Sequence, residues 1–177
     1  MIFETFSALE LPNLLKHTSR SIIGLEIGVW RGDNAGYLLQ NCNNISKLYG
    51  IDPYLPYQDW NRFITKEDID PIKNAAVENL KIFGDRFELI ETTATAAVNR
   101  FKDNSLDFIF IDGNHSFETC HQDLCNYYDK VKPGGIFAGH DYTLQGVNNA
   151  LFKFRKEKKI TGNFKVIPID VWYWIKD

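Results

Sequence analysis

The sequence lacks a strong excess of charge of either sign, because 20 Lys and Arg residues stand against 23 Asp and Glu, for a formal net charge of −3. Without a broad basic surface, nucleic acid is not the expected partner. Long apolar runs are missing too, and Glu4 and Glu10 lie where a signal peptide would carry basic residues. We therefore expect a cytoplasmic protein with no membrane segment.

Cysteine is scarce, and repeats and low-complexity stretches are absent. Cys42, Cys120 and Cys125 form no CxxC pair, and an odd count leaves one thiol unpaired in any disulfide scheme, which suits a reducing compartment. We expect all three to be buried as small hydrophobic side chains. With 177 residues, 44% of them hydrophobic, the chain predicts one domain over residues 1–177.

Short apolar runs alternate with segments of helical periodicity, which is typical of an α/β fold built from βαβ units. Runs apolar through most of their length predict a mostly parallel sheet with helices on both faces. The last two runs, residues 164–169 and 171–175, are joined too closely for a crossover helix, so they should pair antiparallel. The other expected strands are residues 22–27, 47–51, 87–90, 106–111 and 135–139. The expected helices are residues 8–18, inside an N-terminal helical segment 1–21, and residues 33–42, 69–83, 94–101, 116–130 and 145–159.

Residues 53–68 are aromatic and irregular, and they are too long for a simple strand-to-helix turn. Two interpretations stay open with equal weight. The segment is either a lid over a site, or its aromatic residues Tyr54, Tyr57, Trp60 and Phe63 only cover the edge of the sheet.

The first expected strand runs into a glycine turn, Glu26-Ile27-Gly28-Val29-Trp30-Arg31-Gly32-Asp33, and ligands of α/β sheets usually lie at such a turn. A dinucleotide requires G-x-G-x-x-G, but Trp30 and Asp33 add bulk and negative charge where a pyrophosphate would lie. No GK[ST] follows, which excludes a P-loop. S-adenosylmethionine fits better, because its sulfonium and ammonium groups favour acidic neighbours such as Glu26.

Asp52 closes the second expected strand, where a carboxylate is able to accept both ribose hydroxyls. Each feature alone is common, but their order along the chain is more specific. From residue 22 to the end, the sequence resembles the class I S-adenosylmethionine-dependent methyltransferases. The residues that carry this resemblance are Glu26, Gly28, Gly32, Asp52, Asp112 and the turn at 132–135.

The segments FIFIDGNHSFETCHQDL (108–124) and VKPGGIFAGHDY (131–142) narrow the resemblance. They are similar to the small-molecule O-methyltransferase group that includes the macrocin and mycinamicin sugar O-methyltransferases and the cephalosporin biosynthesis methyltransferase. This likeness implies a Rossmann-like seven-stranded sheet with one antiparallel strand, and a small-molecule hydroxyl, such as that of a sugar, as the acceptor. It also implies Thr92, Thr93 and Ala94 as adenine neighbours, although the segment departs from the usual Gly-Asp-Ser type.

An alcohol is a poor nucleophile at neutral pH, so its methylation needs a group that removes its proton. Asp112 ends the fourth expected strand, His140 and Asp141 end the fifth, and His115 begins the following helix. A parallel sheet brings these strand ends to the edge that also carries Gly28. In the resembling enzymes, the histidine that matches His115 is the general base and the acid that matches Asp112 holds a metal.

Two carboxylates and an imidazole at one edge suit a divalent cation such as Mg²⁺ or Mn²⁺, which would lower the pKa of the hydroxyl. The resemblance implies a metal on Asp112 and on an acidic pair at the end of the fifth strand, but that pair here is His140-Asp141. Because imidazole replaces a hard oxygen ligand, Mg²⁺ is less favoured, and Mn²⁺, a softer metal and no metal stay open. On the next helix, Asp123 and His121 are expected to be structural, with Asp123 solvated or bonded to backbone.

Other interpretations are weaker. A dinuclear metallophosphoesterase would need D-x-H and G-D-x-x-D motifs, which the first two expected strands lack. A non-catalytic S-adenosylmethionine-binding or scaffold domain stays the alternative. The basic residues between 153 and 159 predict a solvated helix face rather than an RNA contact. An acceptor pocket would draw on residues 53–68, the N-terminal helix and a neighbouring subunit, so a homo-oligomer stays open.

Overall fold

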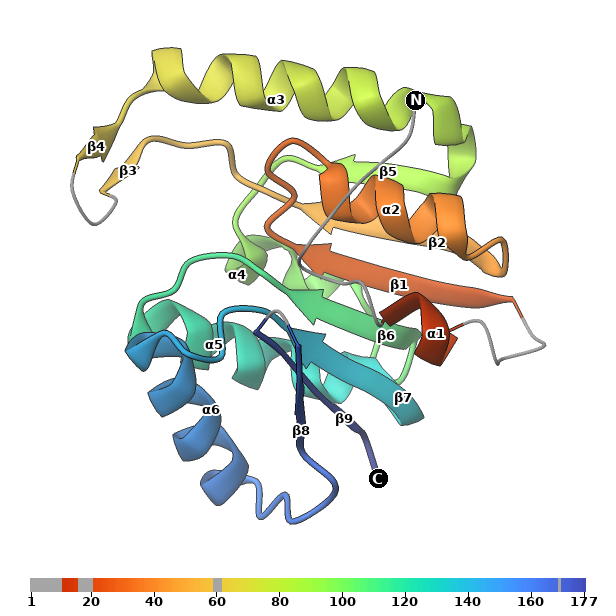
Figure 1. The fold of residues 1–177 in the computed structure, drawn as a ribbon, viewed down its shortest axis with the longest axis vertical. Coiled ribbons are helices and arrows are strands. Elements are labelled where there is room, and N and C mark those ends of the chain that lie inside the picture. Colours follow the sequence, from red (N-terminus) through yellow and green to blue (C-terminus); the bar gives the residue numbers. More distant parts are fainter. Residues whose placement is uncertain (1–10, 16–20, 59–61, 169) are drawn as a thin grey trace.

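The computed structural model describes residues 11–15, 21–58, 62–168 and 170–177, and its centre is a seven-stranded sheet (Figure 1). The strand order is β5-β2-β1-β6-β7-β9-β8. Neighbouring strands from β5 to β7 are parallel, and β9 runs antiparallel to both β7 and β8. The sheet strands are β1 (Ile22–Ile27), β2 (Ile45–Ile51), β5 (Phe87–Ile90), β6 (Leu106–Ile111), β7 (Val131–Gly139), β8 (Lys165–Ile167) and β9 (Val171–Ile175).

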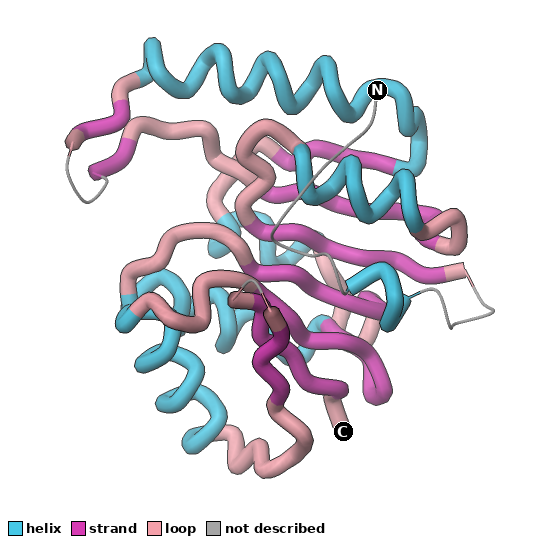
Figure 2. Tube along the Cα trace, viewed as in Figure 1, coloured by secondary structure: helices cyan, strands magenta, loops and turns pink. Residues whose placement is uncertain are grey.

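Helices cover both faces of the sheet, as Figure 2 shows. One apolar cluster joins α1, α2 and α3 to the first face, and a second cluster joins α4, α5 and α6 to the other. Burial of both faces explains why β6 is buried at every position and apolar at every position but Asp107. The prediction of a mostly parallel seven-stranded sheet with one antiparallel strand is confirmed. The helices are α1 (Leu11–Leu15), α2 (Asp33–Asn41), α3 (Lys66–Leu80), α4 (Ala94–Ala97), α5 (Phe117–Tyr127) and α6 (Gln145–Glu157).

Short 3-10 segments extend three of the helices, at Lys81–Arg86, Val98–Arg100 and Tyr128–Lys130. The predicted helices 69–83, 94–101 and 116–130 extend past the ends of α3, α4 and α5, and these 3-10 segments account for most of that extra length. Within the described residues, no helix combines the length and the apolar character that crossing a bilayer requires.

The segment 53–68 differs from the irregular loop that its sequence predicts. It contains a small antiparallel hairpin of β3 (Tyr57–Gln58) and β4 (Phe63–Ile64), and α3 begins at Lys66 rather than at residue 69. The earlier start has a local cause. Thr65 and Asp68 form a capping box, in which each side chain accepts a hydrogen bond from the backbone N–H of the other residue.

Candidate active site

The carboxyl ends of β1, β2, β6 and β7 lie side by side, so the loops that follow them share one edge of the sheet (Figure 1). A close backbone approach at this edge joins the loops after β1 and β6. Gly28 has a φ of +90°, and a Cβ there would lie 2.0 Å from the carbonyl oxygen of Asp112. Asp112 N–H in turn donates to the carbonyl of Ile27 at 2.8 Å. Gly28 is therefore the residue that lets the two loops meet.

The second glycine of the turn serves the packing of α3. Gly32 has a φ of +81°, and a Cβ there would lie 2.6 Å from a methyl carbon of Leu80. Between the two glycines, Trp30 also has a positive φ, of 52°, and leaves 46% of its surface exposed. The turn thus presents an indole to solvent at the position where a dinucleotide fingerprint carries glycine.

Asp52 joins the glycine turn to the loop after β2. One carboxylate oxygen accepts hydrogen bonds from the backbone N–H groups of Val29 and Trp30, each at 3.0 Å, and the other accepts from Tyr54 N–H at 2.9 Å. Burial raises the pKa of Asp52, and these three bonds oppose the rise. The oxygen that accepts from Tyr54 retains a further lone pair, so the carboxylate is still able to accept one hydroxyl.

Tyr54 has a role at this edge that its sequence context does not indicate. The side chain is buried, and its hydroxyl donates to the carbonyl oxygen of Trp30 at 2.8 Å. Its backbone lies in the left-handed region, with a φ of 43°. Tyr54 therefore holds the glycine turn through this hydrogen bond. Of the other aromatic residues in the segment, Tyr57 and Phe63 are exposed on the hairpin, and Trp60 lies outside the described residues.

Glu26 is a buried acid in the middle of this network, with only 1% of its surface exposed. Its Oε1 accepts from the side-chain amide of Asn34 at 2.6 Å, whereas Oε2 has no hydrogen-bond partner among the described residues. Burial raises the pKa of Glu26 to about 8, and the charges of Asp112 and Asp52 add to the rise. The carboxyl is therefore mostly protonated at neutral pH, and a nearby cation would favour its ionisation.

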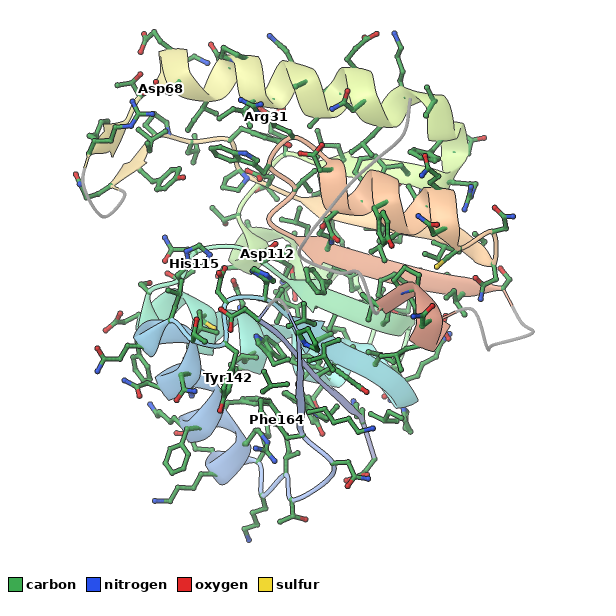
Figure 3. All side chains as sticks on the ribbon, in the orientation of Figure 1. Arg31, Asp68, Asp112, His115, Tyr142 and Phe164 are labelled. Atoms are coloured by element: carbon green, nitrogen blue, oxygen red, sulfur yellow. The ribbon has the colours of Figure 1, made fainter. Side chains whose placement is uncertain are left out.

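Three predicted site residues meet across the loops after β6 and β7. His115 Nε2 lies 2.8 Å from a carboxylate oxygen of Asp141. One ligand atom each of Asp112, His115 and Asp141 lies within 4.8 Å of the other two. Figure 3 shows Asp112 and His115 as neighbours at the edge toward which the strand arrows point. This trio is a set of hydrogen-bonding and metal-ligating groups next to the glycine turn.

The pKa shifts in the trio follow from this crowding. Burial raises the pKa of Asp112 to about 6, and the Asp141 charge raises it further while His140 lowers it. The hydrogen bond to Asp141 raises the pKa of His115. The pKa of Asp141 is lowered, because its hydrogen bonds to His115 and His140 outweigh its desolvation. Asp141 is thus ionised throughout the neutral range, whereas Asp112 loses its proton near pH 6.

His140 stands beside the trio and is held by its backbone. Its N–H donates to the carbonyl of Ile111 at 3.0 Å, and its carbonyl accepts from the indole N–H of Trp172 at 2.9 Å. Its Nδ1 lies 3.2 Å from a carboxylate oxygen of Asp141 and 3.9 Å from one of Asp112. The predicted metal ligands Asp112, His140 and Asp141 are therefore neighbours, and His115 joins them.

The predicted adenine neighbour Thr93 follows β5 at the same edge. Its hydroxyl accepts a hydrogen bond from Ala96 N–H at 3.3 Å and caps α4. The side chain thus has a local structural task, and its contact with adenine stays a prediction.

Several other residues differ from their predicted surroundings. Asp123 is neither solvated nor at the surface: it is 3% exposed, and burial raises its pKa to about 7. Cys42 and Cys120 are buried as expected, but Cys125 is half-buried beside His121. The prediction of an exposed basic face holds for Lys153 and Lys156 of α6, and Lys153 forms an ion pair with Glu157.

The sheet order, with β9 antiparallel between β7 and β8, matches the Rossmann-like fold of the class I methyltransferases. A family model described as "Methyltransferase domain" matches residues 25–142, which is more than half of the chain. The chain belongs to this family. A curated relative, "Uncharacterized protein R132" of Acanthamoeba polyphaga mimivirus, is 29% identical over 156 residues, which cover 81% of this chain and 65% of R132.

Two solved structures share the fold at low sequence identity. A putative caffeoyl-CoA O-methyltransferase from Staphylococcus aureus superposes with a TM-score of 0.70 at 18% identity, over 100% of this chain and 86% of its own. TomG from Streptomyces achromogenes, an O-methyltransferase of tomaymycin synthesis in complex with SAM, gives a TM-score of 0.64 at 12% identity. The match covers 95% of this chain and 79% of TomG.

Proposed function

We propose that this domain transfers the methyl group of S-adenosylmethionine to a hydroxyl of a small molecule, with His115 as the general base. The observation that carries the proposal is the His115–Asp141 pair at 2.8 Å, beside Asp112 and at the edge of the glycine turn. If Nε2 of His115 donates to Asp141, its Nδ1 keeps a lone pair for the proton of an alcohol.

The residues at the edge fit the cofactor. A cationic group of S-adenosylmethionine, its sulfonium or its ammonium, would interact with Glu26. The Oε2 of Glu26 is buried and has no hydrogen-bond partner among the described residues. Asp52 is proposed to accept a ribose hydroxyl with the remaining lone pair of its Oδ1, and Gly28 and Gly32 are proposed to let the backbone of the turn approach the cofactor. Thr93 and its neighbours are proposed to border the adenine.

Methyl transfer then needs one displacement step. The acceptor oxygen attacks the methyl carbon, the bond from that carbon to sulfur breaks, and its electron pair stays on sulfur as a neutral thioether. The hydroxyl proton passes to Nδ1 of His115, where Asp141 stabilises the resulting imidazolium. Holding both reactants at this edge supplies the proximity part of the rate enhancement.

The same edge fits a divalent metal ion. Asp112 and Asp141 bring two carboxylates together, and burial together with the Asp141 charge raises the pKa of Asp112, so a cation there would relieve both effects. Asp112, His140 and Asp141 would hold it, which leaves His115 free to act as the base. When bound, such a metal would lower the pKa of the acceptor hydroxyl.

The acceptor pocket is proposed to lie under the β3–β4 hairpin, which extends beyond the carboxyl edge in Figure 1. Leu55, Tyr57 and Phe63 are large apolar side chains there, and all three are exposed. Their exposure supports a lid that closes on an acceptor, such as a sugar-bearing metabolite of the kind the macrocin group methylates. A neighbouring subunit would be a second source of pocket residues.

Calorimetry with S-adenosylmethionine and S-adenosylhomocysteine tests the cofactor. Failure of both to bind removes the proposal. A screen of hydroxyl acceptors with and without EDTA then tests transfer and the metal, using His115→Ala against the matched control Glu118→Gln, an exposed residue on α5. Binding without transfer to any acceptor would favour the non-catalytic alternative.

A further inference from the structure

A second cluster of metal-ligating side chains lies outside the candidate active site, where α5 packs against α6. His121 and Cys125 are one turn apart on α5, and Glu157 ends α6. One ligand atom from each lies within 4.8 Å of the other two. We propose that His121, Cys125 and Glu157 bind a divalent metal ion of the Zn²⁺ class, with water as the fourth ligand.

Two of the three donor-to-donor distances are close to those of a tetrahedral site, and the third is below 4.8 Å. His121 Nε2 lies 3.0 Å from Glu157 Oε2 and 3.9 Å from Cys125 Sγ. With Zn–N and Zn–O of about 2.0 Å and Zn–S of about 2.3 Å, tetrahedral angles place N and O about 3.3 Å apart and N and S about 3.5 Å apart. Both observed distances are within a few tenths of an ångström of these values. The sulfur lies nearly as far from Nε2 as from Nδ1, at 3.9 Å and 3.8 Å, so the Cys125 side chain has to rotate toward the Nε2 side of the ring to complete the site.

The chemistry of the donors selects the metal. A thiolate and an imidazole favour Zn²⁺ and similar soft or borderline ions over Mg²⁺ and Ca²⁺, which take oxygen ligands. Binding requires the Cys125 thiol to release its proton to solvent, while His121 binds as neutral imidazole. Glu157 is suited to be the third protein ligand, because its two carboxylate oxygens have different neighbours. Lys153 pairs with Oε1 at 3.7 Å, and Oε2 faces His121.

The surroundings hold the imidazole in place. The ring of Phe117 stacks on His121, with centroids 5.8 Å apart and an interplanar angle of 21°. Only 17% of the His121 side chain is exposed, so its orientation is restricted before a metal arrives. This site would clamp α5 to α6, the two helices that follow the loops carrying His115 and Asp141.

Cobalt(II) is the probe, because a cobalt–thiolate bond gives a charge-transfer band in the near ultraviolet. Titration of the reduced protein should give this band at one equivalent. Cys125→Ser should abolish it, and His121→Ala should weaken Co²⁺ and Zn²⁺ binding at least about 100-fold, since even outer-shell changes lower affinity 10–100-fold. Zn²⁺ should displace the cobalt and raise the thermal unfolding midpoint of the wild type but not of Cys125→Ser.

Two control variants separate this site from its alternatives. Cys120→Ala removes another thiol of α5 and should leave the band unchanged. Asp141→Asn disrupts the acidic trio, which contains no sulfur, and should also leave it unchanged. Absence of the band in the wild type, its survival in Cys125→Ser, or equal Zn²⁺ affinity of wild type and His121→Ala would each overturn the proposal.

Discussion

Glu26 makes cofactor binding sensitive to pH in a way that can be calculated. In the free protein, burial raises its pKa to about 8, so ionising it at pH 7 costs about 1.4 kcal/mol. A cation about 5 Å away, at an effective dielectric constant of 20, favours the carboxylate by about 3 kcal/mol. The attraction exceeds the cost, so S-adenosylmethionine should bind the ionised form and lower the pKa of Glu26 by about 2 units.

The expected signature is proton release. At pH 7 the free carboxyl is about 90% protonated, so binding should release close to one proton. Affinity should rise about eightfold between pH 7 and 8.5, a range in which Asp112, with a pKa of about 6, is largely ionised already. Glu26→Gln keeps an oxygen for the Asn34 amide and should lose this dependence.

Calorimetry in buffers of different ionisation enthalpy measures the released proton directly. Titration of the ligand's own amino group is common to both proteins, so the difference between wild type and Glu26→Gln isolates Glu26. Equal pH dependence in the two proteins, or a wild-type heat that does not change with the buffer, would refute this reasoning.

The remaining predictions concern stability, catalysis and the turn. Because the folded pKa of Glu26 lies above the ordinary 4.5, its contribution to stability is fully present below pH 4.5 and is lost as the pH rises toward 8. Between these two pH values the free wild type should therefore lose about 4 kcal/mol more than Glu26→Gln in urea unfolding; parallel curves would show that burial does not perturb this carboxyl. His115→Ala should lower methyl transfer by about 10²–10⁴-fold with little change in cofactor affinity. Asp141→Asn should move the acidic limb of the pH–rate profile to lower pH, because Asp141 raises the pKa of His115. An unmoved limb would show that Asp141 and His115 are not coupled. Gly28→Ala should destabilise the fold by about 3 kcal/mol or more, because its Cβ would meet the Asp112 carbonyl, whereas Gly84→Ala, with open space and a φ of +52°, should lose about 1 kcal/mol in the same denaturation assay. Similar losses in the two would show that the close contact at Gly28 is easily relieved.

Periodicity and composition predict the sheet well, because buried parallel strands must be apolar on both faces. The bounds of β1, β5, β6 and β9 agree with the predicted runs, and β2 begins only two residues earlier. The start of α3 was predicted three residues late, although Thr65 and Asp68 have the spacing of a capping box. The strand β7 begins at Val131, before the Pro133–Gly135 turn, because pairing with Leu106 of β6 extends it.

The sequence alone determined which acids, histidines and glycines reach the carboxyl edge, since the end of each parallel strand follows from its apolar run. The tertiary contacts decided the charge state and the hydrogen-bond partners of these groups. Burial makes Glu26 a neutral acid, three backbone N–H groups occupy Asp52, and a histidine from one loop meets an aspartate from another. Tyr54 and the Cys125 cluster likewise depend on partners far along the chain. Charge state and hydrogen bonding depend on solvent exclusion and on neighbours in space, which spacing along the chain does not specify.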